Sequence, residues 1–142
     1  MQWYGEQLDE DERIARATLW DDDGALGSGG WYAYDRGPRD GFREARWVVI
    51  DRADEGVMDS RPQAADDQAV ARHIAEHDPA RVLREIDTKR RALDHYARIC
   101  EHTKHGDEAY VLAEGAVAQQ IKIMASGYSH RPGYREEWRP TV

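Results

Sequence analysis

The chain has 142 residues, a formal net charge of −8, 40% hydrophobic residues and 34% charged residues. This length suits one domain of common size, and the composition is that of a globular protein rather than a disordered one. An acidic chain is a poor general binder of nucleic acid because phosphate contacts require a positive surface, although a local basic site is left open. We therefore expect a single domain over residues 1–142.

The charge is distributed unevenly along the chain. Residues 1–80 carry 19 acidic and 9 basic side chains, a net of 9 − 19 = −10, whereas residues 81–142 carry 9 acidic and 11 basic ones, a net of 11 − 9 = +2. Such an asymmetry favours association between copies of the chain or binding of a local anionic partner. A protein is the expected partner, and a homo-oligomer stays open.

The compartment is indicated by cysteine usage and by the N-terminus. Cys100 is the one cysteine, so an internal disulfide is impossible, which suits a reducing compartment. The segment MQWYGEQLDEDER is acidic and lacks the apolar run of a signal peptide. No window approaches the roughly 20 apolar residues of a membrane span. We expect a cytoplasmic protein without membrane contact and without a cofactor.

The first half of the chain predicts a helix followed by a hairpin. Residues 2 to about 19 place Trp3, Tyr4 and Leu8 at helical spacing. Two β-like segments follow at 29–36 and 44–52, and the intervening GPRDG at 37–41 suits a hairpin turn. A short segment around Val57 and Met58 could add a third, edge strand.

The second half predicts helices. The second helix is expected from about Asp66 to His77, the third from Pro79 to about Thr103, and the fourth over about 107–126. Asp78 is a good N-cap and Pro79 a favoured first helical residue. The third helix has an apolar seam formed by Val82, Leu83, Ile86, Leu93, Tyr96, Ala97 and Cys100.

A Gly/Pro-interrupted tail over 127–142 carries Tyr134 and Trp138, four residues apart, so that one short helical turn would place both against the body. The predicted fold class is therefore α+β. It comprises about four helices, including one long amphipathic helix, packed with a small antiparallel β-hairpin.

The candidate interface is a basic stripe on the third helix. Arg81, Arg84, Arg91 and Arg98 recur at intervals of three and seven and fall opposite the apolar seam. An outward arginine line can meet a phosphate or an acidic protein surface. The alternative interpretation is a solvated helix face.

A second candidate is a metal site at His73, His77 and Asp78. Two histidines at i and i+4 lie on one helix face and can share a metal ion. The alternative interpretation is packing and capping at the turn between two helices. The chain lacks H-E-x-x-H, G-x-S-x-G and a Walker-type G-K-[ST], so an enzyme is not favoured.

Three blocks of sequence carry a resemblance to a known family. They are LDEDERIARAT at 8–18, HIAEHDPARVLREIDTKRRALD at 73–94 and GYREEWRP at 133–140. With its HDPARVLREI-type helix and YREEWRP-type tail, the chain resembles a family of small actinobacterial and actinophage proteins known only as a domain of unknown function. Many members carry several cysteines between the long helix and the tail. Only Cys100 is present here, so any family metal site would be lost or altered.

The resemblance implies an accessory gene of an actinobacterium, its phage or a mobile element, and it implies no substrate. The expected function is that of a non-enzymatic accessory or binding protein whose partner engages the basic stripe. One alternative is a metal-dependent hydrolase or nuclease that uses His73 and His77. Another, suggested by the acidic N-terminal half, is a DNA-mimicking or anti-defence phage protein.

Overall fold

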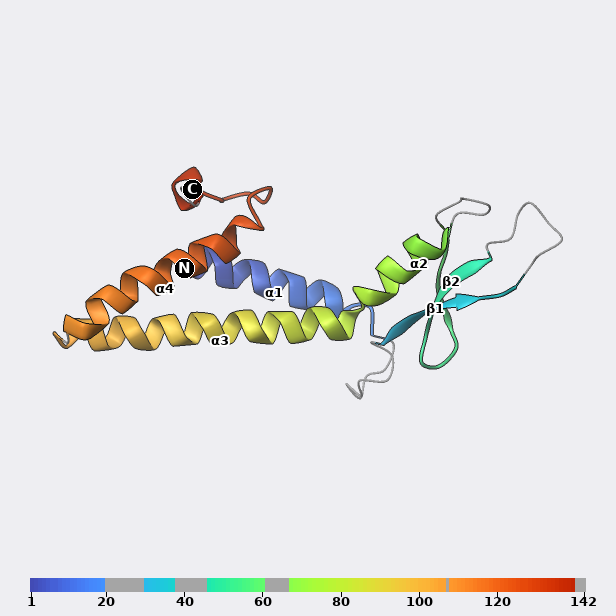
Figure 1. Cartoon of the computed structure of the whole chain (residues 1–142), viewed down its shortest axis with the longest axis horizontal. Coiled ribbons are helices and arrows are strands. Elements are labelled where there is room, and N and C mark those ends of the chain that lie inside the picture. Colours follow the sequence, from blue (N-terminus) through green and yellow to red (C-terminus); the bar gives the residue numbers. More distant parts are fainter. Residues whose placement is uncertain (20–29, 38–45, 61–66, 107, 140–142) are drawn as a thin grey trace. The chain divides into compact units, whose positions relative to one another are not determined.

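A computed structural model describes residues 1–19, 30–37, 46–60, 67–106 and 108–139. Its elements, in chain order, are α1 (Gln2–Arg16), β1 (Trp31–Asp35), β2 (Trp47–Asp51), β3 (Gly56–Asp59), α2 (Asp67–Glu76), α3 (Pro79–Lys104), α4 (Glu108–Ser126) and the short 3-10 helix η1 (Glu136–Trp138) (Figure 1). The predicted α+β class, with one long helix, is confirmed. The expected GPRDG turn and the predicted start of the fourth helix at 107 lie largely outside the described residues.

The chain forms two compact units. The sheet unit comprises residues 12–85, and the helical unit comprises residues 1–11 and 86–142. Helices α1 and α3 each contribute residues to both units. The expectation of a single domain over the whole chain stays a prediction. No helix among the described residues is long and apolar enough to cross a membrane.

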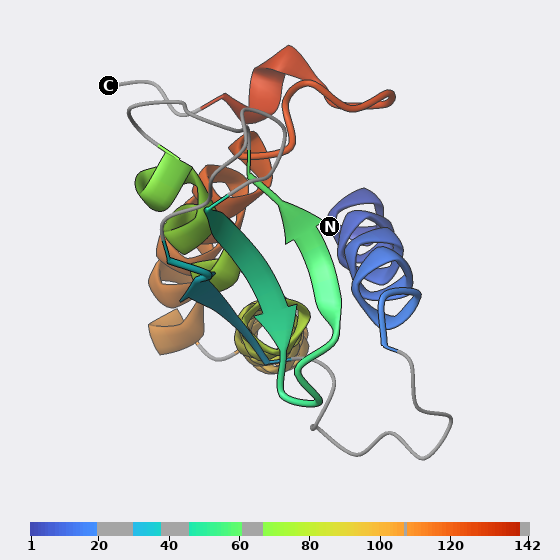
Figure 2. The ribbon, with the colours of Figure 1, turned by 90° about the vertical axis from the view of Figure 1, so that its right-hand side faces the viewer.

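The sheet has three antiparallel strands in the order β1-β2-β3, with β2 in the middle (Figure 2). The short segment around Val57 and Met58 is thus a strand, so the sheet is larger than the expected hairpin. Strand β1 pairs in register with β2, from Trp31 opposite Asp51 to Asp35 opposite Trp47. The pairing of β2 with β3 shifts between Val49 and Ile50.

Helix α2 packs on one face of this sheet. Ala71 and Ala75, one helical turn apart, are buried against Val49 of the central strand. Trp31 and Ala33 of β1 pack against the same cluster because alternate residues of a strand share a face. Small alanines let the helix approach the sheet closely, and this brings the flank of α2 beside β1.

The junction between α2 and α3 follows the prediction. The Asp78 carboxylate accepts a hydrogen bond from the backbone N–H of Arg81 at 2.6 Å. The backbone carbonyl of Asp78 accepts a hydrogen bond from the N–H of Val82 at 3.1 Å. Asp78 is therefore an N-cap, and Pro79 begins α3. Capping fixes the start of α3 directly after the end of α2.

In the helical unit, the buried side of α3 differs from the predicted seam. Ile86 is buried as expected, whereas Ala97 is exposed and Ile99, outside the seam, is buried. Helix α4 contacts the last turns of α3. The Cys100 thiol lies 3.7 Å from the Glu114 carboxylate. A straight helix drifts by about 20° per heptad relative to a strict seven-residue repeat, so the buried side of α3 moves away from the predicted seam along its length.

The tail contacts the first turn of α1 within the same unit. The Trp3 ring lies 5.8 Å from that of Tyr134 and 5.2 Å from that of Trp138, measured between ring centroids, and the Trp3 indole N–H donates to the carbonyl of Pro132 at 3.0 Å. Gly133 has φ +85°, and a Cβ there would lie 2.8 Å from Trp3 Nε1. Glycine is thus required both by the backbone conformation and by the close approach of the indole.

A polar network also holds the tail. The Asp11 carboxylate accepts a hydrogen bond from the Tyr128 hydroxyl at 2.6 Å and forms an ion pair with Arg131. The Arg131 guanidinium lies over the Tyr128 ring, 4.8 Å from its centroid. Burial, and then the bond to Asp11, raises the pKa of Tyr128 far above its ordinary value.

Candidate functional site

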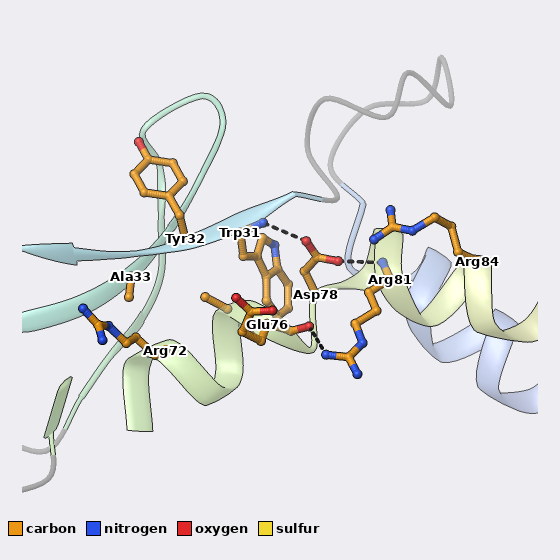
Figure 3. Close-up of a pocket in the computed structure, with 9 residues that line it drawn as sticks. Trp31, Tyr32, Ala33, Arg72, Glu76, Asp78, Arg81 and Arg84 are labelled. Atoms are coloured by element: carbon orange, nitrogen blue, oxygen red, sulfur yellow. Dashed lines mark hydrogen bonds between the residues drawn. The ribbon is translucent and has the colours of Figure 1, made fainter. Parts of the chain in front are cut away.

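A hollow of the sheet unit lies where β1, the end of α2 and the start of α3 meet. Its volume is about 550 Å³, within the range of roughly 300–1,000 Å³ that is common for ligand pockets. Three arginines line it, Arg72 from α2 and Arg81 and Arg84 from α3 (Figure 3). The other lining residues include Trp31, Tyr32, Ala33, Ala75, Glu76 and Asp78. This set is called the arginine pocket below.

Asp78 positions the elements around the arginine pocket. One carboxylate oxygen caps α3 through the Arg81 N–H, and the other lies 3.4 Å from the backbone nitrogen of Trp31, which donates to it (Figure 3). Both oxygens therefore accept backbone hydrogen bonds, and the residue ties the beginning of β1 to the beginning of α3. The Asp78 carboxylate therefore already makes hydrogen bonds within the protein before any ligand binds.

Arg81 joins the two helices. Its guanidinium donates to the backbone carbonyl of Glu76 at 3.0 Å and to the Glu85 carboxylate at 2.9 Å. The first contact satisfies a carbonyl at the end of α2 that has no partner inside the helix. Arg81 therefore uses some of its N–H groups to hold α2 and α3 together. It also contributes a positive charge to the pocket.

Arg72 and Arg84 border the pocket from different helices. Both side chains are exposed, and Figure 3 shows them on opposite sides of Trp31 and Asp78. Arg72 makes no ion pair within the part of the chain that the structure describes. The pocket carries three guanidinium groups against the carboxylates of Glu76 and Asp78. Among the lining side chains the guanidinium groups outnumber the carboxylates by 3 − 2 = 1, which favours an anion.

Tyr32 borders the same hollow, but its ring lies on the other side of β1 from Ala33 (Figure 3). Its hydroxyl donates to Asp54, and this hydrogen bond raises the pKa of Tyr32 above its ordinary value. The phenol is thus engaged with the β2–β3 turn and presents no free donor to the pocket.

The other half of the predicted stripe lies in the helical unit. Arg91 forms an ion pair with Asp87 at 2.8 Å, with both side chains mostly exposed. Arg98 is exposed and makes no ion pair among the described residues. His102, four residues after Arg98, stacks on Tyr110 with 4.4 Å between ring centroids. Exposed helical ion pairs of this kind contribute only about 0.3–0.5 kcal/mol, so this half has the character of a solvated face.

The residues of the predicted metal site all make structural contacts. The rings of His73 and His77 lie 4.3 Å apart, and Nδ1 of His77 lies 2.8 Å from the carbonyl oxygen of His73, to which it donates. Asp78, the expected third ligand, is the α3 cap. Among the described residues there is no group of three or more histidine, cysteine, aspartate or glutamate side chains that could hold a metal ion.

Sequence reasoning missed Arg72 and Trp31 as members of the site. Arg72 directly follows the buried Ala71 on α2, and a polar residue beside a core position carries no distinctive signal. Trp31 lies 47 positions before Asp78. Only the packing of α2 on the sheet brings these residues together with Arg81 and Arg84.

A second hollow, of about 210 Å³, lies in the helical unit between the first turn of α1 and the tail. It is lined mainly by aromatic residues, including Trp3, Tyr4, Tyr96 and Trp138, with Lys122 as its cation. It is smaller than typical ligand pockets, and its aromatic rings already pack against one another. The arginine pocket is therefore the stronger candidate site.

The described residues form a small α+β fold with a hollow lined by three arginines. The chain matches a family of unknown function, DUF6221, over residues 1–140 and belongs to that family. No curated protein and no solved structure matches the chain significantly.

Proposed function

We propose that this chain is a non-enzymatic binding protein that engages an acidic segment of a partner protein through the arginine pocket. The observation that carries the proposal is the convergence of Arg72, Arg81 and Arg84, from two different helices, on one hollow of the sheet unit. Guanidinium groups recognise carboxylates through paired hydrogen bonds, which supply specificity as well as attraction. Nucleic acid is disfavoured because its extended phosphate backbone would meet the net charge of −8 over a wide surface, whereas a short acidic segment would contact the pocket alone.

The arginines of the pocket and of the stripe differ in their proposed roles. Arg84 and Arg72 would contact the carboxylates of the partner, and Arg81 would hold the junction and add charge. Arg91 and Arg98 belong to the helical unit and do not line the pocket, so no direct contact with the bound segment is proposed for them. The role of an accessory gene product of an actinobacterium or its phage, acting in the cytoplasm, belongs to the same proposal and rests on the resemblance of the three sequence blocks.

The experiment compares two charge-matched double variants. Arg72→Glu with Arg84→Glu and Arg91→Glu with Arg98→Glu each change the net charge by −4, because each substitution replaces +1 with −1. The probe is a fluorescent peptide that alternates Thr and Glu, and its binding is measured by anisotropy at physiological salt. Circular dichroism establishes that both variants fold.

We expect the double variant Arg72→Glu with Arg84→Glu to weaken peptide binding roughly tenfold or more, since a hydrogen bond to a charged group contributes about 1.5–3 kcal/mol. The control double variant, Arg91→Glu with Arg98→Glu, should retain most of the affinity for the peptide. Equal losses in the two variants would show that only net charge matters. The absence of binding to the unmodified protein would reject the proposed function.

The metal-dependent alternative has its own test. Elemental analysis of protein purified without a histidine tag would detect a stoichiometric transition metal bound at His73 and His77. We expect none, because Asp78 is occupied as a cap by the N–H groups of Arg81 and Trp31.

A further inference from the structure

The arginine pocket lies beside an edge strand. Among the described residues the sheet order is β1-β2-β3, so within them β1 pairs with β2 along one side and has no strand partner along the other. Trp31, Tyr32 and Ala33 of β1 all border the pocket. An unpaired strand edge presents backbone N–H and C=O groups that can template another strand.

The hydrogen-bonding register shows which residues of β1 face that open edge. The N–H of Arg36 donates to the carbonyl of Arg46 at 2.9 Å, so this pair is hydrogen bonded across the two strands. In an antiparallel pair such positions alternate with non-bonded ones. Tyr34 and Tyr32 therefore point their backbone groups toward β2, whereas Ala33 and Asp35 point theirs toward the open edge.

Trp31 supplies an independent check of this register. It has the same parity as Ala33, and its N–H indeed points away from β2, because it donates to the Asp78 carboxylate at 3.4 Å. The carboxylate therefore closes the first position of the open edge. The N–H and C=O of Ala33, the next position, make no hydrogen bond within the part of the chain that the structure describes. The open edge thus begins at Ala33, inside the arginine pocket.

We infer that the acidic partner binds as an extended strand that pairs with β1 from Ala33 onward. This inference rests on the proposed function and specifies its binding mode. The backbone of Ala33 would supply two hydrogen bonds, as in other cases where a peptide extends a sheet. Every second side chain of the added strand would face the α2 side of the sheet, on which Ala33 also packs. Arg72 of α2 borders the pocket there.

Charge complementarity selects the occupant. An added strand with carboxylates at alternate positions would place them on the side bordered by Arg72. A strand with lysines there would meet like charges. The backbone pairing is indifferent to sequence, so the arginines would provide the selection. The ligand class is therefore an extended peptide segment with Asp or Glu at every second residue.

Amide hydrogen exchange measured by NMR tests the binding mode. On addition of the alternating Thr–Glu peptide, the amides of Ala33 and Asp35 should exchange at least several-fold more slowly. Those of Tyr32 and Tyr34, already bonded to β2, should change little. A peptide of the same composition ordered as pairs, Thr-Thr-Glu-Glu, divides its carboxylates between the two faces and should bind more weakly.

A backbone variant provides the second test. Ala33→Pro removes the N–H that faces the open edge, a position where edge strands tolerate proline. Ala33→Gly is the matched control, because it alters the side chain and keeps the N–H. We expect the proline variant to lose at least tenfold in peptide affinity and the glycine variant to lose much less.

If Ala33→Pro fails to fold, N-methylated peptides replace it. Methylation of one alternate set of peptide nitrogens should abolish binding, and methylation of the other set should not. Peptide binding that depends on Arg72 and Arg84 but leaves the Ala33 amide unprotected would overturn strand addition while the proposed function stands. A complete lack of binding would reject both.

Discussion

Asp78 accepts a hydrogen bond at 3.4 Å from the backbone N–H of Trp31, a residue 47 positions earlier in the chain. The same carboxylate caps α3 through Arg81. One side chain thereby connects the first residue of β1 to the first turn of α3. The position of Arg84 relative to the open edge of the sheet depends on this connection, so the integrity of the candidate site can be tested at Asp78.

Replacing Asp78 with alanine should lower the free energy of unfolding by about 1 kcal/mol, as is usual for the loss of an N-cap. Asp78→Asn keeps one acceptor oxygen and should retain most of that stability. Urea denaturation of the three proteins measures the difference. If alanine were as stable as the wild type, the cap would have no energetic role.

Gly133 and Gly106 provide a matched pair of positions for testing the contact between the tail and Trp3. Both have positive φ, +85° and +83°, but only at Gly133 would a Cβ meet another group, Trp3 Nε1 at 2.8 Å. Alanine at either position should cost about 1–2 kcal/mol from the left-handed conformation. Gly133→Ala should cost more and also change the near-ultraviolet circular dichroism of Trp3. Equal costs would show that the tail does not rest on this contact.

The raised pKa of Tyr4 predicts that the folded protein loses stability at alkaline pH. Burial, and then the nearby Asp11 charge, raises the pKa of Tyr4 from 10.0 to about 12. The folded protein therefore holds this proton more tightly than the unfolded chain, so the contribution is complete below pH 10 and is lost as the pH rises toward about 12.

Tyr4→Phe is the corresponding variant. The buried Tyr4 hydroxyl has no hydrogen-bond partner among the described residues, so its removal should leave the free energy of unfolding unchanged or slightly higher at neutral pH. The alkaline decline should become shallower, with the remainder due to the other tyrosines whose pKa is raised, Tyr32, Tyr96 and Tyr128. A loss above about 1 kcal/mol at neutral pH would indicate that the hydroxyl has a partner after all.

The ion pair between Asp35 and Arg46 can be tested by an NMR titration of the Asp35 carboxyl group. The hydrogen bonds from the Arg46 guanidinium, at 2.8 and 2.7 Å, and from the Gly37 N–H lower the pKa of Asp35 to about 2. Arg46→Gln should raise the pKa of Asp35 back toward 3.8. In the wild type the stabilisation is present above pH 3.8 and is lost as the pH falls to about 2. An unchanged Asp35 titration in the variant would contradict the assignment of this ion pair.

The sequence predicted the local features well because their causes are local. Asp78 followed by Pro79 marks the start of α3, and the spacing of Tyr134 and Trp138 anticipated the short turn of η1. The third strand was visible only as two apolar residues, since a short edge strand has little periodicity. The arginine pocket could be predicted only in part. Arg81 and Arg84 share a helix, but their meeting with Arg72 depends on how α2 packs on the sheet.

The most direct test of the arginine pocket is an NMR titration that observes the side-chain Nε–H signals of the arginines. The alternating Thr–Glu peptide is added to protein labelled at arginine nitrogen. We expect the signals of Arg72 and Arg84 to shift progressively and saturate, while those of Arg91 and Arg98 stay nearly unchanged. Uniform small shifts of all four signals, or shifts confined to Arg91 and Arg98, would contradict this expectation.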